Sequence, residues 1–132
     1  MEILTSTVMA RVPVTILRLQ GNLDSHSAGY FDDQLRRLID SGVKDILLDF
    51  SGVPYMSSVG IRSLSAAYNW LHPVQSGAEQ KALSQALHDG SYHAPHLKLL
   101  NPSPGVMKIL GLVALDRYLP VFTDEQAALA DF

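Results

Sequence analysis

The spacing of apolar residues predicts two β-strands at the start of the chain. Residues 2–9 and 14–20 are rich in β-branched and bulky side chains, and turn-forming residues at 12–13 and 21–22 punctuate their ends. Because the two segments follow each other closely, they are expected to form an antiparallel pair.

The pattern then changes to the three- and four-residue spacing of an amphipathic helix. Ser25 is a favourable N-cap residue, and Ser41-Gly42 ends the segment. Five apolar residues are expected to form the buried face of this helix: Tyr30, Phe31, Leu35, Leu38 and Ile39.

A third strand and a second helix follow directly. Residues 44–50 form a short apolar run framed by turn residues, which is typical of a buried central strand. After a loop at 51–54, a helix is expected from Ser57 or Ser58 to Leu71. Residues 72–95 then interrupt the rhythm with a polar segment, in which 78–88 are expected to form a short helix.

The last third of the chain returns to alternating strands and helices. Strands are expected at 96–100 and 118–122, with a helix led by residues 102–104 between them. Thr123 is expected to cap a final helix that carries Glu125 and Gln126 in its first turn, as in a capping box. The alternation predicts an α/β fold, with a mixed sheet of four or five strands and helices packed largely on one side.

Length and composition favour a single globular domain over residues 1–132. The chain has 47% hydrophobic and 17% charged residues, which is enough apolar material for one core. A net charge of −3 with scattered Lys and Arg argues against nucleic-acid binding. Without cysteine, a secretory signal pattern or an apolar run of about 18 residues, the expectation is a cytoplasmic protein with no direct membrane insertion.

The segment 49–61 carries the chemistry of interest, because it leads from a buried strand to two hydroxyls at a helix start. The first N–H groups of a helix lack internal partners and the helix dipole is positive there, so a phosphate is tolerated. Phosphorylation of Ser57 or Ser58 would add about −1.5 to −2 charges and exclude a partner docked over the site. The alternative is that these serines only cap the helix.

Several motifs, in their order along the chain, resemble those of the STAS domain family of the anti-sigma factor antagonist type. The strand and turn that open the family domain are similar to RLQGNLD at 18–24, and its phosphorylation loop and second helix are similar to DFSGVPYMSSVGI at 49–61. Its fourth strand and third helix resemble residues 99–112, and its closing strand and helix resemble residues 118–128. The resemblance covers nearly the whole chain, apart from a family-atypical insert at about 72–95.

The resemblance implies a partner switch. Family members bind an anti-sigma factor that is itself a serine kinase of the GHKL ATPase class, and that binding frees the sigma factor. The kinase phosphorylates the domain at the start of the second helix, and a PP2C-type phosphatase reverses the modification. The alignment implies Ser58 as the acceptor and Ser57 as the alternative, in a bacterial protein that regulates transcription. The implied partner-binding residues are Asp24, Met56, Ser57, Ser58, Gly60 and Ile61.

The sequence departs from the family pattern beside the implied acceptor. The family usually has Asp just before the acceptor and Ser or Thr just after it, where this chain has Ser57 and Val59. The departures favour an alternative, a STAS scaffold or subunit of a stressosome-like or lipid-transport complex that is not phosphorylated. A small-ligand or lipid-binding module is a third class.

Catalysis and cofactor binding are not expected. The chain lacks the Gly-x-Ser-x-Gly turn of serine hydrolases and the Gly-rich loop that binds nucleotide phosphates. Side chains that could ligate a metal gather near the insert, but loop histidines are usually solvated and no cysteine assists them. They are His72, His88, Asp89, His93 and His96. The insert is expected to adjust partner choice as a surface segment.

Overall fold

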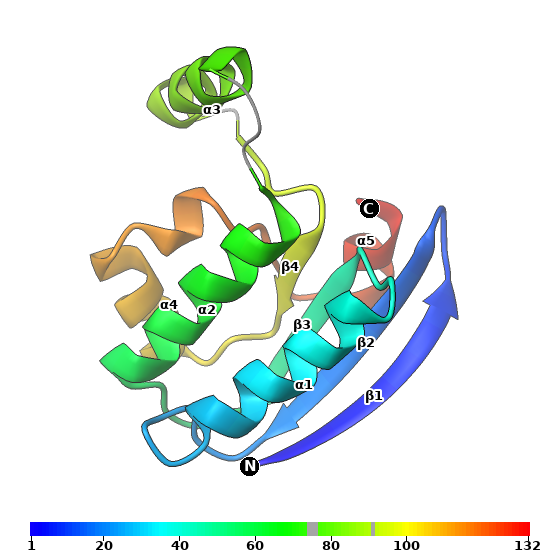
Figure 1. Ribbon diagram of the computed structural model, residues 1–132. Helices are drawn as coiled ribbons and strands as arrows, with labels where there is room; N and C mark the ends of the chain where they lie inside the picture. Colours follow the sequence, from blue (N-terminus) through cyan, green and yellow to red (C-terminus); the bar gives the residue numbers. More distant parts are fainter. Residues whose placement is uncertain (74–76, 91) are drawn as a thin grey trace.

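The computed structural model describes residues 1–73, 77–90 and 92–132 and contains one five-stranded mixed sheet. The strands lie side by side in chain order: β1 (Glu2–Met9), β2 (Pro13–Gln20), β3 (Ile46–Gly52), β4 (Leu97–Leu100) and β5 (Val121–Phe122). β1 and β2 are antiparallel, whereas β2 to β5 are parallel to one another (Figure 1). The predicted mixed sheet and its antiparallel opening pair are confirmed.

Helices cover the two faces of the sheet unequally. They are α1 (Ala28–Asp40), α2 (Ser58–Leu71), α3 (Gly77–Asp89), α4 (Pro104–Leu112) and α5 (Glu125–Ala130), with a 3₁₀-helix, η1 (Leu115–Arg117). α1 and α2 lie on one face and the short α5 lies on the other (Figure 1). α3 corresponds to the short helix expected within the insert, and none of its residues is buried. The expected packing of helices largely on one side is confirmed.

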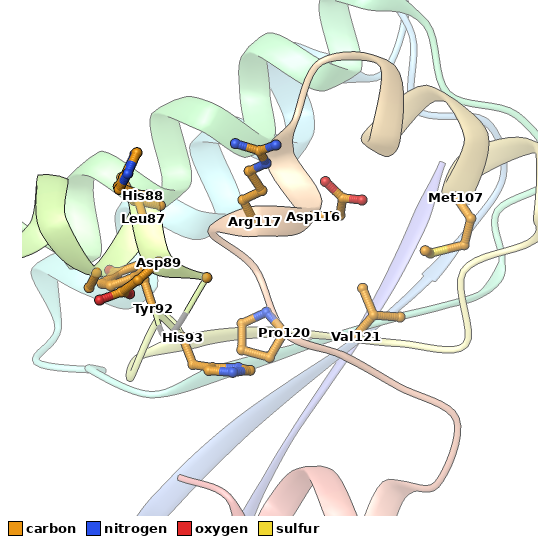
Figure 2. A pocket seen from close by; sticks show the side chains of 12 residues that line it. Leu87, His88, Asp89, Tyr92, His93, Met107, Asp116, Arg117, Pro120 and Val121 are labelled. Atoms are coloured by element: carbon orange, nitrogen blue, oxygen red, sulfur yellow. The ribbon is translucent and has the colours of Figure 1, made fainter.

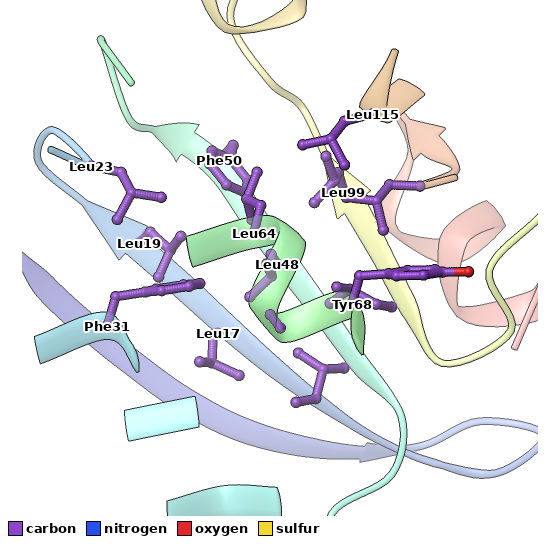
Figure 3. Close-up of a cluster of buried hydrophobic side chains, with 14 of the residues drawn as sticks. Leu17, Leu19, Leu23, Phe31, Leu48, Phe50, Leu64, Tyr68, Leu99 and Leu115 are labelled. Atoms are coloured by element: carbon purple, nitrogen blue, oxygen red, sulfur yellow. The ribbon is translucent and has the colours of Figure 1, made fainter. Parts of the chain in front are cut away.

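Alternation along the central strands divides the core into two clusters. One face of the sheet presents Leu17, Leu19, Leu48, Phe50 and Leu99 to side chains of α1 and α2 (Figure 3). The opposite face presents Val14, Ile16, Leu47 and Leu100 to Ala128 and Leu129 of α5. Because β2 to β4 are buried on both sides, their sequences read as apolar runs rather than as a half-buried alternation.

Charged side chains attach the chain's end to the second face of the sheet. Lys98 is 1% exposed, and its Nζ donates to Asp131 Oδ2 at 2.6 Å and to the Ala94 carbonyl at 3.2 Å. Its ammonium also lies 4.9 Å from the centre of the Phe132 ring. A buried lysine is costly unless it is paired, so these contacts hold the segment after α5 against β4.

The N-caps predicted for α1 and α5 are wrong by two residues and by one residue, respectively. The N-cap of α1 is Ser27 rather than Ser25, because the Asp24 carbonyl accepts hydrogen bonds from the N–H groups of Ser27 and Ala28 and so forms a turn first. The N-cap of α5 is Asp124 rather than Thr123, since the Asp124 carboxylate accepts from Ala127 N–H at 3.0 Å. A carboxylate caps a helix as well as a hydroxyl does.

Two other expectations are corrected. Tyr30 is 46% exposed and does not belong to the buried face of α1. The strand expected at 118–122 is reduced to Val121–Phe122, because η1 draws the N–H groups of Tyr118 and Leu119 to the Leu115 carbonyl.

A histidine at the end of α2 joins the helix to the start of β4. His72 Nδ1 lies 2.8 Å from the Tyr68 carbonyl, and His72 Nε2 accepts the His96 N–H at 3.1 Å. A carbonyl only accepts, so Nδ1 carries the proton and the ring must be neutral to make both bonds. Burial lowers the pKa of His72 below its ordinary value of 6.5, although the Tyr68 carbonyl opposes this shift.

His72 should make stability depend on pH. Because its folded pKa is lowered, its contribution is complete above pH 6.5 and is lost as the pH falls from 6.5 through the folded pKa. We expect the melting temperature of the wild type to fall more steeply than that of His72→Gln between about pH 7.5 and about pH 5, measured by circular dichroism. Parallel slopes for the two proteins would exclude this role.

Candidate functional site

The loop before α2 is held by backbone hydrogen bonds to the loop before α1. Leu23 N–H donates to the Tyr55 carbonyl at 3.1 Å, and Ser57 N–H donates to the Leu23 carbonyl at 3.0 Å. Closer to the sheet, Gly21 N–H donates to the Gly52 carbonyl at 2.9 Å. The short parallel bridge between Leu23 and Met56 therefore extends the β2–β3 pairing to the start of α2.

Two glycines allow these loops to approach each other. A Cβ on Gly60 would lie 2.5 Å from the Leu23 carbonyl oxygen and 2.7 Å from Met56 Cγ. A Cβ on Gly52 would lie 2.6 Å from the Leu19 carbonyl oxygen. Contacts this short displace the backbone, so only glycine fits at either position in this arrangement.

Ser57 and Ser58 have different surroundings. Ser57 is the N-cap of α2, and its Oγ accepts from Val59 N–H at 3.2 Å and Gly60 N–H at 3.5 Å. Ser58 is the first residue of the helix and is exposed, and its hydroxyl forms no hydrogen bond within the described residues. The capping role considered in the sequence thus belongs to Ser57, and the Ser58 hydroxyl is left accessible.

Asp24 lies next to Leu23, in the loop before α1 that is hydrogen-bonded to the loop before α2. Its Oδ1 accepts from His26 N–H at 3.0 Å and lies 3.4 Å from Ser27 Oγ. Ser27 in turn donates to the Asn22 carbonyl at 2.7 Å, which closes the loop. Asp24 is half-buried, and these hydrogen bonds hold its carboxylate in the loop whose Leu23 pairs with Tyr55 and Ser57.

The remaining site residues divide into buried and accessible ones. Met56 is 2% exposed and Gly60 is buried, so in this arrangement they position the loop and do not face solvent. Ile61 is half-buried and lines a hollow of about 290 Å³ with Val113 and Leu115. Ser58, Ile61 and Ser65 recur at helical spacing, so they share one face of α2.

Exposed apolar side chains outside the predicted site residues lie in the loop before α2 and at the end of α4. Tyr55 is 56% exposed in the loop, and Leu112 and Val113 at the end of α4 are 76% and 49% exposed. Large exposed apolar side chains that gather near one site are typical of protein-binding surfaces. The available signal was the run of apolar residues continuing past the end of the predicted helix into Val113.

An ion-pair cluster is centred on Asp49 in the middle of β3 and reaches Glu125 of α5. Arg18 contacts Asp49 at 2.9 Å and Glu125 at 2.8 Å, while Ser51 donates through N–H and Oγ to Asp49 at 3.0 and 2.7 Å. Burial acts to raise the pKa of Asp49, but the hydrogen bonds from Ser51 and Arg18 outweigh it and lower the pKa. The cluster therefore keeps a buried, charged carboxylate within β3 and ties that strand to β2 and α5.

The insert forms a separate pocket far along α2 from Ser58. Its cavity of about 620 Å³ is bounded by the end of α3, by Tyr92 and His93, and by Asp116, Arg117 and Pro120 (Figure 2). Tyr92 hydrogen-bonds through its hydroxyl to Tyr68, which follows Ser58 by ten residues, or about 15 Å of helix. The residues of the insert that line this pocket therefore lie away from Ser57 and Ser58.

The histidines near the insert do not gather into a metal site in the described part of the chain. His72 and His96 have ring centres 5.3 Å apart, and His96 Nδ1 contacts Asp45 at 2.8 Å. His88 and His93 line the pocket instead. Within residues 1–73, 77–90 and 92–132, no three His, Asp or Glu side chains are placed to bind one ion. Of the helices described, none is both long and apolar enough to cross a membrane.

Comparison with known proteins relates this geometry to a family. The sequence model of the STAS domain family matches residues 7–75, from the end of β1 to just before α3. The fold is similar to that of an anti-sigma factor antagonist from Thermotoga maritima, at 19% identity and a TM-score of 0.71 over 96% of this chain and 90% of that one. An anti-sigma factor antagonist from Mycobacterium paratuberculosis matches at 18% identity and a TM-score of 0.69, over 97% and 92%. The Bacillus cell fate determinant SpoIIAA, in its phosphorylated form, matches at 22% identity and a TM-score of 0.61, over 96% of both chains.

Replacing the two serines separately should distinguish their roles. We expect Ser57→Ala to lower the free energy of unfolding by about 1 kcal/mol, because the first N–H groups of α2 lose their cap. Ser58→Ala should change it by less than about 0.5 kcal/mol. Urea denaturation followed by circular dichroism measures both values, and equal losses would contradict the assignment.

The contact at Gly60 gives a second test. We expect Gly60→Ala to lower the free energy of unfolding by about 1–3 kcal/mol, because its Cβ overlaps the Leu23 carbonyl. Gly29→Ala is the matched control, since it lies in α1 with nothing within 4 Å of the new Cβ and should be neutral or stabilising by up to about 1 kcal/mol. The same urea titration serves, and a Gly60→Ala protein as stable as the wild type would refute the close packing.

Proposed function

We propose that this chain, which belongs to the STAS domain family, is an anti-sigma factor antagonist that binds an anti-sigma factor serine kinase and is released by phosphorylation of Ser58. The observation that carries the proposal is an exposed, unbonded Ser58 hydroxyl at the first position of α2, beside a serine that already caps the helix. Release from the kinase returns the sigma factor to inhibition, and a PP2C-type phosphatase restores the binding form.

The helix start makes Ser58 the better acceptor of the pair. A phosphate on Ser58 leaves the Ser57 cap intact and lies near the positive end of the helix dipole. A phosphate on Ser57 would replace the hydroxyl that Val59 and Gly60 now use. The similarity to SpoIIAA in its phosphorylated form supports a fold that accommodates such a group.

The surface around Ser58 supports a switch by charge. Ser58 shares a helix face with Ile61, and Tyr55, Leu112 and Val113 present apolar area nearby. A partner docked there would desolvate the phosphate, whose charge of about −1.5 to −2 makes that desolvation costly. Asp24 adds a further negative charge on the adjoining loop, while Met56 and Gly60 hold the loop in place.

A second function is favoured by the residues that flank Ser58. Val59 offers no hydroxyl and Ser57 no charge, so a kinase would find fewer polar groups beside the acceptor. A STAS scaffold or subunit of a stressosome-like or lipid-transport complex would use the same α2 surface without phosphorylation. The two functions differ in whether ATP affects partner binding.

Incubation with the cognate kinase and ATP tests the proposal. We expect mass spectrometry to place one phosphate on Ser58, and Ser58→Asp to weaken kinase binding by about tenfold or more. Ser58→Ala should bind as the wild type does but no longer dissociate when ATP is added. Ser84→Ala, on the exposed α3, is the control and should keep the full cycle.

An active kinase that modifies neither Ser57 nor Ser58 would exclude the phosphorylation switch. Binding that persists unchanged with ATP would then favour the scaffold.

A further inference from the structure

The outer edge of β1 is a complete and unprotected strand edge. β1 is the first strand of the sheet, and within the described residues only β2 pairs with it. The pairing runs without a shift from Glu2 opposite Gln20 to Met9 opposite Pro13, so no bulge disrupts the strand. A strand of eight residues with one free side presents a row of unpaired N–H and C=O groups about 27 Å long.

Natural proteins usually protect such an edge with proline, lysine, a bulge or a covering segment. The other edge of this sheet is protected in this way, because β5 has only two residues, comes directly after Pro120 and contacts α5. β1 has no proline and no basic residue, and its single charge is Glu2 at one end. Leu4 and Met9 are 50% and 75% exposed on it. β1 is therefore the edge of this sheet that is open to pairing with a further strand.

The sequence of β1 identifies a second copy of itself as the complementary strand. Read in opposite directions from Ser6, the strand matches itself: Thr5 with Thr7, Leu4 with Val8, and Ile3 with Met9. We propose that this chain forms a two-fold symmetric dimer by antiparallel pairing of β1 with β1 of a second copy, centred on Ser6.

The faces of the sheet agree with this register. Directly opposed residues of an antiparallel pair lie on the same face. Ile3 packs in the cluster beneath α1 and α2, whereas Val8 packs in the cluster on the α5 side. Pairing centred on Ser6 joins Ile3 to Met9 on the first face and Leu4 to Val8 on the second, so the faces of both copies continue each other. A shift by one residue would oppose side chains from different faces.

The dimer is independent of the switch site. The outer edge of β1 is separated from α2 by β2 and α1 (Figure 1). Both copies therefore keep Ser58 exposed, and their α1 and α2 helices lie on the same side of the joined sheet. The proposal does not rest on the function proposed above, and the experiments below contain no kinase.

Sedimentation equilibrium on the full chain is the first measurement. Between about 1 µM and about 1 mM, the range of weak specific association, we expect the mass to rise from 14.4 kDa to twice that value and then stay constant. A mass that stays at 14.4 kDa throughout, or that grows without limit, overturns the proposal.

Charge at the two-fold axis gives a matched set of variants. Ser6→Lys and Ser6→Glu each place like charges directly opposite each other, so each alone should weaken self-association by about tenfold. Mixing the two should restore a heterodimer, because opposite charges then face each other. Circular dichroism verifies that both variants fold, and a mixture that associates no better than either variant alone rejects the register.

A cross-link tests the geometry without relying on affinity or charge. The chain has no cysteine, so Ser6→Cys places one thiol per copy about 4.5–5.5 Å, Cβ to Cβ, from its partner across the axis. Diamide removes two electrons and two protons from the thiol pair, and we expect a disulfide-linked dimer on a non-reducing gel. Glu2→Cys is the control, since position 2 would lie about 27 Å from its symmetry mate and stay uncross-linked. Equal cross-linking of the two variants indicates random collision and overturns the proposal.

Discussion

The hydrogen bonds of the Leu23 backbone fix where α2 begins. Its N–H and C=O groups bind Tyr55 and Ser57, and its side chain is fully buried in the core beneath α1 and α2. Gly60 lies against the Leu23 carbonyl, so the first turn of α2 is held by the same residue from a second direction. The backbone contacts therefore place Ser57 where its hydroxyl caps the helix, and they leave the Ser58 hydroxyl exposed.

The sheet, its helices and the switch loop could be predicted because their signals are local and periodic. The apolar run at 44–50 and the serines at a helix start are signals within short segments, and they predict β3 and α2. The caps were harder to predict, because a turn at Asp24 moves the start of α1 to Ser27 and the Asp124 carboxylate caps α5 in place of the neighbouring Thr123. A favourable residue such as Ser25 or Thr123 nearby was not enough, since several residues there could cap equally well.

The burial of residues that pack against distant segments could not be predicted from the sequence. Met56 and Gly60 belong to the family motif, but only the contact with Leu23 shows that they are buried beneath the loop. Lys98 reads as a surface residue of a strand and is instead buried with Asp131 and Phe132, because α5 folds back over the second face. Long-range contacts of this kind leave no periodic pattern in the sequence.

The exposure of α3 has a consequence for how such a protein could diverge. None of its residues contributes to the core, so changes along its surface carry little cost in stability and are not constrained by the packing of the sheet. The segment 49–61, by contrast, combines the exposed hydroxyl with buried contacts, and a larger residue at Gly52 or Gly60 would displace the backbone. Substitutions along α3 can therefore accumulate at a lower cost in stability than substitutions at the buried positions of this segment.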